Sequence, residues 1–238
     1  MKTNVFLKIG LWSVLSLFSS QFLSSQNCDN FYPLKKGNSF EMQEFDGQNK
    51  LQGTDVVTVI DRKDVGGTAE ATMQAIHTDA KGKAGAPVEF KVKCDGAVFY
   101  MDLQTFASSM EKNKDMELKM DGGFSEMPVK NMKVGDTLKD AVMKMHMLQK
   151  GKEMGLMVMT IRRKIDAKES VTVPAGTFEC YKIAVESESA MEMMGMKMPG
   201  GKNQHVEYFS PGIGTVKSEF FDKSGKLMRY SVLSKITK

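Results

Sequence analysis

Alternation of apolar and polar residues with a period of two recurs along most of the chain. It is clearest at residues 89–94, where every second side chain is apolar. This period is typical of a β-strand with one buried face. Turn signals such as Asp46-Gly47 and Asp95-Gly96 separate the runs. The pattern predicts about a dozen antiparallel strands, at residues 39–45, 51–61, 68–78, 87–94, 97–103, 137–148, 156–166, 169–173, 178–188, 205–209, 215–222 and 227–236.

Two segments depart from the alternation. Residues 104–120 are predicted to be partly helical or loop-like, and residues 191–202 to form a methionine-dense loop that contains glycine. No Pro/Ser-rich linker divides the chain, so we expect one domain from residue 26 to residue 238. Many short strands at this spacing favour an all-β sandwich or barrel.

Residues 1–25 are predicted to be a secretory signal peptide. A basic start with Lys2 and Lys8 precedes an apolar run at residues 9–18, and small serines follow it. We expect cleavage near Ser25 and an exported protein in the periplasm or at the outer membrane. The apolar run is too short to span a bilayer and no longer one follows, so the sequence predicts no transmembrane span.

The charges are nearly balanced once the predicted signal peptide is removed. Without Lys2 and Lys8 the chain keeps 31 basic and 29 acidic residues. This small excess gives no reason to expect nucleic acid or an acidic membrane as a partner. Methionine is the strong bias, with 21 residues, 17 of which lie between Met101 and Met198.

The chain has three cysteines, Cys28, Cys94 and Cys180. In an oxidising compartment an odd number predicts one disulfide and one free thiol. We favour Cys28–Cys94, because a bridge would anchor an otherwise loose terminal segment to a predicted strand. The pairings 94–180 and 28–180 stay open. Residues 25–27 lack the leucine and small residues of a lipobox, so we do not expect Cys28 to carry lipid.

Four separated segments, in order, resemble a known family. They are residues 28–37 (CDNFYPLKKG), 134–140 (VGDTLKD), 173–183 (VPAGTFECYKI) and 208–217 (YFSPGIGTVK). The set resembles the TapB-like group of secreted envelope proteins, which is itself similar to an uncharacterised periplasmic domain family. Phe209 departs from the Trp-Tyr-like aromatic pair expected there. The resemblance implies one strongly curved antiparallel sheet, a half-barrel or open barrel distantly similar to the carriers LolA and LolB, with a short helix or loop insertion. It implies no activity and no catalytic residue.

The methionines are the first candidates for a functional site. On two successive predicted strands they share one face with Ile161, and Arg163 follows on that face. Methionine most often fills irregular core space, but flexible thioethers also form adaptable apolar surfaces. The sequence therefore predicts a concave lining for a lipid-like ligand. Arg163 would contact the headgroup if it points inward, and the alternative is a β-bulge that turns it outward. The lining residues are Met143, Met145, Met147, Met157, Met159 and Ile161.

Copper is an alternative interpretation, because thioethers are soft ligands suited to Cu(I). The predicted loop suits it best, since a loop can gather its sulfur atoms. The candidate ligands are Met191, Met193, Met194, Met196 and Met198. On the neighbouring strand, His146 is expected to point away from Met145 and Met147.

The sequence predicts neither an enzyme nor a cofactor. It has no Gly-x-Ser-x-Gly elbow, and His77, His146 and His205 lack the spacing of zinc ligands. Glu179 beside Cys180 disfavours a thiolate nucleophile. The leading function is non-enzymatic binding of an apolar or amphipathic ligand in the envelope. An envelope protein partner, bound through a strand edge or the methionine-rich loop, is the other alternative.

Overall fold

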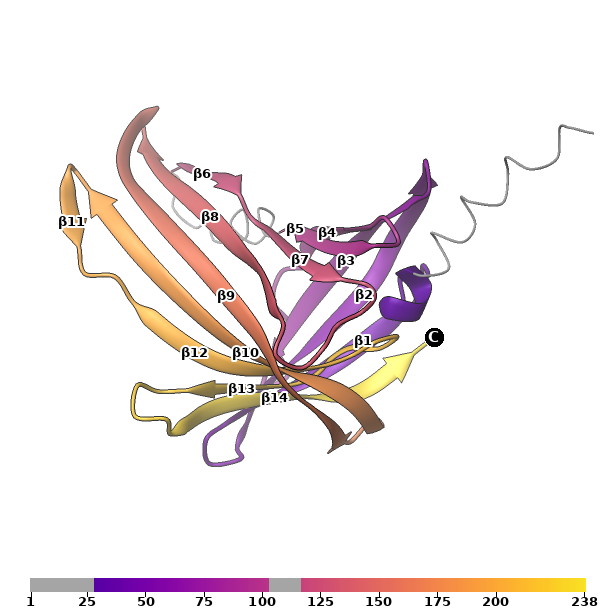
Figure 1. Ribbon diagram of the computed structural model, residues 1–238. Helices are drawn as coiled ribbons and strands as arrows, with labels where there is room; N and C mark the ends of the chain where they lie inside the picture. Colours follow the sequence, from indigo (N-terminus) through magenta and orange to yellow (C-terminus); the bar gives the residue numbers. More distant parts are fainter. Residues whose placement is uncertain (1–27, 103–116) are drawn as a thin grey trace, which may run out of the picture.

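The computed structural model describes residues 28–102 and 117–238, which form an all-β fold as predicted (Figure 1). Residues 1–25 and most of the predicted insertion at 104–120 lie outside these ranges. One helical turn at residues 28–31 precedes the strands. The strands are β1 (Ser39–Asp46), β2 (Leu51–Val65), β3 (Thr68–Asp79), β4 (Val88–Cys94), β5 (Val98–Asp102), β6 (Glu117–Gly122), β7 (Phe124–Pro128), β8 (Thr137–Gln149), β9 (Lys152–Val173), β10 (Gly176–Met193), β11 (Met196–Met198), β12 (Lys202–Ser210), β13 (Gly214–Phe221) and β14 (Leu227–Thr237).

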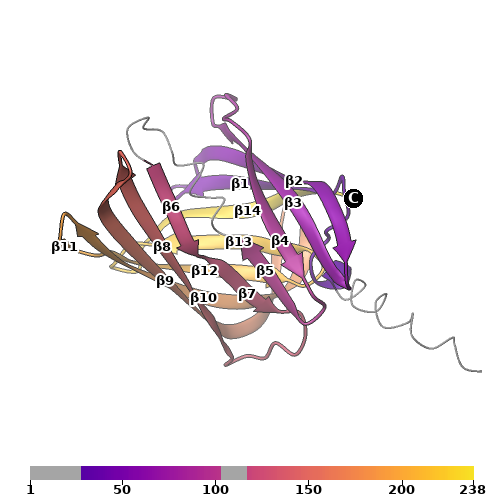
Figure 2. The ribbon, with the colours of Figure 1, turned by 90° about the horizontal axis from the view of Figure 1, so that it is seen from above.

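All strands belong to one antiparallel sheet that curls into a nearly closed barrel (Figure 2). The strand order is β6-β8-β9-β10-β12-β13-β14-β1-β2-β3-β4-β5-β7, and β11 pairs with β10 outside this path. In the described part of the chain, no ladder joins β7 to β8, so the barrel has one seam there. The strongly curved single sheet implied by the family resemblance is therefore confirmed, although it closes further than a half-barrel.

Two predictions of local structure are wrong. The predicted strands at 156–166 and 169–173 are one 22-residue strand, β9, because a bulge beside Asp166 absorbs the break in alternation. Residues 117–120, predicted as helix or loop, belong to β6, which pairs with β8. β6 and β7 have only six and five residues, and the alternation in β6 is confined to residues 117–120.

One end of the barrel is filled by the main hydrophobic core. The helical turn inserts Phe31 against Phe99 and Phe209, with ring centroids 5.8 and 4.9 Å apart. Fully buried Ile165 of β9 and Ile183 of β10 join the same cluster. We call this the closed end and the other the open end. A second cluster forms where the ends of β9 and β10 pack against β12, β13, β14 and β1.

The Cys28–Cys94 disulfide joins the helical turn to β4, which confirms the favoured pairing. Cys180 is free and buried, as expected. Within residues 28–102 and 117–238, no helix has the length and apolarity needed to cross a membrane.

Candidate functional site

Methionines cover part of the inner face of the barrel towards the open end. Ile161 on β9 packs against the main core, and alternation places Met157 and Met159 on its side of the strand. Across the β8–β9 ladder, Met143 opposes Met159 and Met145 opposes Met157. Directly opposed residues share a face. The structure thus brings the predicted lining residues of β8 and β9 together on one inner face.

The ladder continues this surface over three more strands. Met145 also opposes Met120 on β6, while Met157 opposes Met191 and Met191 opposes Met198. One row of five methionines therefore crosses five strands, and a parallel row adds Met147, Met193 and Met196. We call the ten residues together the methionine face: Met120, Met143, Met145, Met147, Met157, Met159, Met191, Met193, Met196 and Met198.

The predicted loop at 191–202 is mostly a β-hairpin, which corrects the sequence interpretation. Met194 and Gly195 form its two-residue turn, with φ of 51° and 77°. Positive φ at both positions is the geometry of a type I′ turn, which usually contains Asn-Gly. Methionine at the first position hid this signal. Met194 lies at the exposed tip and is separate from the four methionines that pair along the hairpin.

The methionine face belongs to neither of the two core clusters. Most of its side chains are half-buried, and Met196 and Met198 are 64% and 46% exposed. Met147 is the buried member, because its terminal methyl lies over Gly155, where a Cβ would be only 2.8 Å away. The face is therefore an accessible apolar surface, in contrast to the packed interior at the closed end.

Arg163 does not project freely beside the methionines. Its guanidinium is buried and donates hydrogen bonds to Ser125 Oγ (2.8 Å), Glu126 O (2.8 Å) and Lys139 O (3.1 Å). These acceptors lie on β7 and β8, the strands on either side of the seam. Burial lowers the pKa of Arg163, while the nearby carboxylates of Glu207, Glu126 and Asp140 oppose that shift. The side chain thus links the barrel walls where the ladder is missing.

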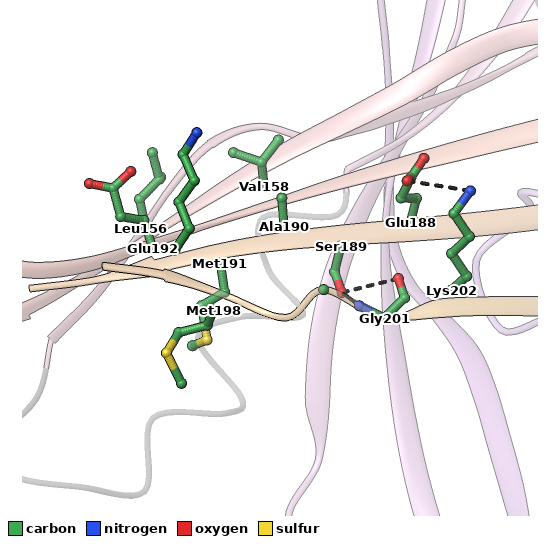
Figure 3. A pocket seen from close by; sticks show the side chains of 12 residues that line it. Leu156, Val158, Glu188, Ser189, Ala190, Met191, Glu192, Met198, Gly201 and Lys202 are labelled. Carbon is green, nitrogen blue, oxygen red and sulfur yellow. Dashed lines mark hydrogen bonds and ion pairs between the residues drawn. The ribbon is translucent and has the colours of Figure 1, made fainter. Parts of the chain in front are cut away.

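Two hollows in the structure lie along β9 and β10. One of about 480 Å³ sits at the base of the β10–β11 hairpin, where Figure 3 shows Met191 and Met198 on the side of the ribbon away from Leu156 and Val158. A second, of about 540 Å³, borders Arg163, Glu186 and His205. Neither is lined by the six apolar residues predicted from β8 and β9. The apolar surface formed by the lining residues of β8 and β9 is therefore open, and neither hollow encloses it.

Other polar candidates are dispersed. His146 contacts Glu153 and Asp121 through opposite ring nitrogens, and His205 contacts Glu207. Burial, together with Glu179 and Glu169, raises the pKa of Cys180 to about 11, so its thiol is protonated at neutral pH.

Met120 is a residue of the methionine face that the sequence did not predict. The alternation of residues 117–120 was the available signal, but pairing of β6 with β8 is what places Met120 in the site.

The chain belongs to the DUF3108-like family, whose model matches residues 35–233. Membership in the TapB-like group is a finer assignment and stays a prediction. None of the curated proteins compared with the chain matches it.

Two solved structures share the fold. One is a "putative lipoprotein" of Parabacteroides distasonis, 21% identical, with a TM-score of 0.66. The other is a "putative exported protein" with a YmcC-like fold from Bacteroides fragilis, 25% identical, with a TM-score of 0.62. Each alignment covers 87% of this chain and 99% of the other.

Proposed function

We propose that this protein is a non-enzymatic, exported protein of the cell envelope that binds a lipid-like, amphipathic ligand on the methionine face. The observation that carries the proposal is a face of ten methionines, nine of them partly or fully exposed, on the inner side of the sheet and outside both core clusters. The predicted signal peptide supports an envelope location, as does the likeness to a "putative lipoprotein" and a "putative exported protein".

Methionine suits such a surface physically. Its unbranched thioether adapts to different alkyl shapes at small cost. Covering about 200 Å² of apolar surface would contribute roughly 5 kcal/mol before the costs of ordering ligand and protein. Arg163 is hydrogen-bonded at the seam, so we assign it no headgroup contact.

The experiment is native mass spectrometry of protein purified from cell envelopes, followed by titration with a fluorescent fatty acid. We expect co-purified lipid and saturable binding for the natural chain. Met157→Lys should lose both, because a charge in the centre of the row must be desolvated by a bound alkyl chain. Met228→Lys is the matched control, since Met228 is 53% exposed on β14, outside the methionine face. Equal binding by both variants would contradict the proposal.

Cu(I) binding is a second candidate, favoured by the alignment of five thioethers in one row across neighbouring strands. Replacing Met145, Met157 and Met191 by leucine separates the two functions. Leucine keeps the volume and the apolar character but removes the sulfur. The triple variant should retain fatty-acid binding if the ligand is a lipid. It should lose Cu(I) in competition with a chromophoric chelator if the ligand is copper.

A further inference from the structure

A histidine and two carboxylates converge on β1, β2 and β3 at the open end. Asp55 and His77 are direct partners across the β2–β3 ladder, and Glu44 opposes Gly53 across the β1–β2 ladder. Towards the closed end, the face that carries Asp55 and His77 bears the core residues Val59 and Met73. The three polar side chains therefore lie on the inner face of the barrel.

Their geometry suits one shared ion. One ligand atom from each residue lies within 4.8 Å of the other two, and His77 Nδ1 is 2.9 Å from Asp55 Oδ1. Tetrahedral zinc with ligands at about 2.0–2.1 Å places those ligands roughly 3.3 Å apart. An ion that takes the place of the proton between His77 Nδ1 and Asp55 Oδ1 would therefore require these two atoms to move apart by a few tenths of an ångström. Glu44 reaches it by a change of side-chain torsion, because its side chain is partly exposed.

Gly53 makes room for the imidazole. A Cβ at this position would lie 2.5 Å from His77 Cε1 and 2.8 Å from the carbonyl oxygen of Thr78. The ring therefore lies across Gly53, which is the strand partner of Glu44. A side chain at position 53 would push the ring away from both carboxylates, so the backbone itself supports the convergence.

Charge also favours a cation there. Two carboxylates face one histidine, and the nearest fixed positive charge described is Arg229, whose Nη1 is 3.9 Å from Glu44. The other histidines lack this arrangement. His205 has a single carboxylate partner, and the partners of His146 sit on opposite ring nitrogens, where they cannot share an ion. Among the described residues, Glu44, Asp55 and His77 form the group of a histidine and carboxylates whose ligand atoms are close enough to share one ion.

We propose that Glu44, Asp55 and His77 bind a divalent transition-metal ion, represented by Zn²⁺, with open positions left for water or a ligand. One imidazole nitrogen with two carboxylate oxygens is a donor set that Zn²⁺ and its first-row neighbours accept. This inference is independent of the methionine face, which uses other residues on β6 and β8–β11.

The test is a Zn²⁺ titration of the untagged protein against a chromophoric chelator, with NMR of the three histidines. We expect one ion per chain, and a shift of the His77 imidazole resonances while those of His146 and His205 stay in place. His77→Gln and Glu44→Gln should each weaken binding at least about tenfold, since each removes a direct ligand. His146→Gln is the matched control and should leave the affinity unchanged.

Circular dichroism and thermal unfolding verify that the variants fold, which is expected because the side chain of His77 is 50% exposed. Absence of binding at 100 µM Zn²⁺, or equal weakening by His146→Gln and His77→Gln, would overturn the proposal. Fatty-acid binding by the same variants separates this result from the lipid proposal, because loss of Zn²⁺ alone leaves the methionine face intact.

Discussion

Arg163 shows how one side chain can replace part of a missing β-ladder. The bulge between Leu138 and Ala141 leaves Lys139 O outside the β8–β9 pairing, and β7 offers Glu126 O from across the seam. The guanidinium has several donors in a fixed plane and can reach both carbonyls together with Ser125 Oγ. The sequence left open whether Arg163 points inward or is turned outward by a β-bulge; in the structure it points inward and bonds Ser125 Oγ and two backbone carbonyls.

Arg163→Met should lower the free energy of unfolding by about 2–4 kcal/mol, because it leaves buried carbonyl groups without donors. Urea denaturation followed by circular dichroism measures the change. Arg162→Met is the matched control. Arg162 pairs with Glu186 and Glu188 at the surface, so its loss should lower the free energy of unfolding much less than the loss of Arg163. Equal effects of the two changes would mean that the seam does not depend on Arg163.

Cys180 is predicted to be unreactive in the folded protein. Burial and two neighbouring carboxylates raise its pKa to about 11, so the thiolate nucleophile is scarce below that pH. Ellman's reagent at pH 8 should therefore detect no thiol in the native state and one per chain in guanidinium chloride, since Cys28 and Cys94 are bridged. Rapid labelling of Cys180 in the native protein would show that β9 and β10 open readily near the turn that joins them.

At the scale of elements, the sequence predicted those strands whose turns have a clear residue signature. Asp46-Gly47 and Asp95-Gly96 marked true hairpins, and the strands on either side of them follow the expected ranges. The Met194-Gly195 hairpin and the long β9 were missed, because an unusual turn residue and a bulge each mimic a break. β6 and β7 were missed for another reason, since their pairing partners are set by closure of the whole sheet.

The candidate site could be predicted from the sequence to about the same extent as the strands. Alternation placed the methionines of β8 and β9 on a shared face, which the register confirms. The extension through Met120, Met191 and Met198 depends on inter-strand register, which one sequence does not encode locally. The convergence of Glu44, Asp55 and His77 has the same origin, because three strands contribute one residue each.

The disulfide fixes an element that has few backbone bonds of its own. It closes a separation of 66 residues, for which the loop-entropy relation gives about 4 kcal/mol of stabilisation. We expect the Cys28→Ser/Cys94→Ser double variant to unfold at lower urea concentration. Limited proteolysis should then cut near residues 28–34 first, because Phe31 loses its tether to β4. An unchanged midpoint would mean that aromatic packing alone holds the turn.

For the whole molecule, the two ends of the barrel have different chemistry. The closed end is filled by the helical turn and the main core, whereas the open end presents the methionine face and the polar cluster of β1–β3. Figure 2 shows the strands that carry them, β8–β11 and β1–β3, on different sides of the barrel. A barrel filled at one end only keeps a stable scaffold and leaves inner side chains free for ligands. This difference between the two ends of the barrel is the structural basis of both proposals.

The seam gives a prediction that concerns the entire sheet. Among residues 28–102 and 117–238, β7 is paired with a strand on one side only, and side chains such as Arg163 and the Lys139–Glu126 ion pair link it to β8. β13, in contrast, has a paired strand on both sides. Native-state hydrogen exchange should therefore show faster exchange in β7 than in β13, since local opening of an edge breaks fewer bonds than opening of a central strand. Arg163→Met should accelerate exchange in β7 and leave β13 nearly unchanged beyond its effect on global stability. Equal protection of the two strands in the natural chain would indicate that the ladder continues across the seam and that the barrel is fully closed.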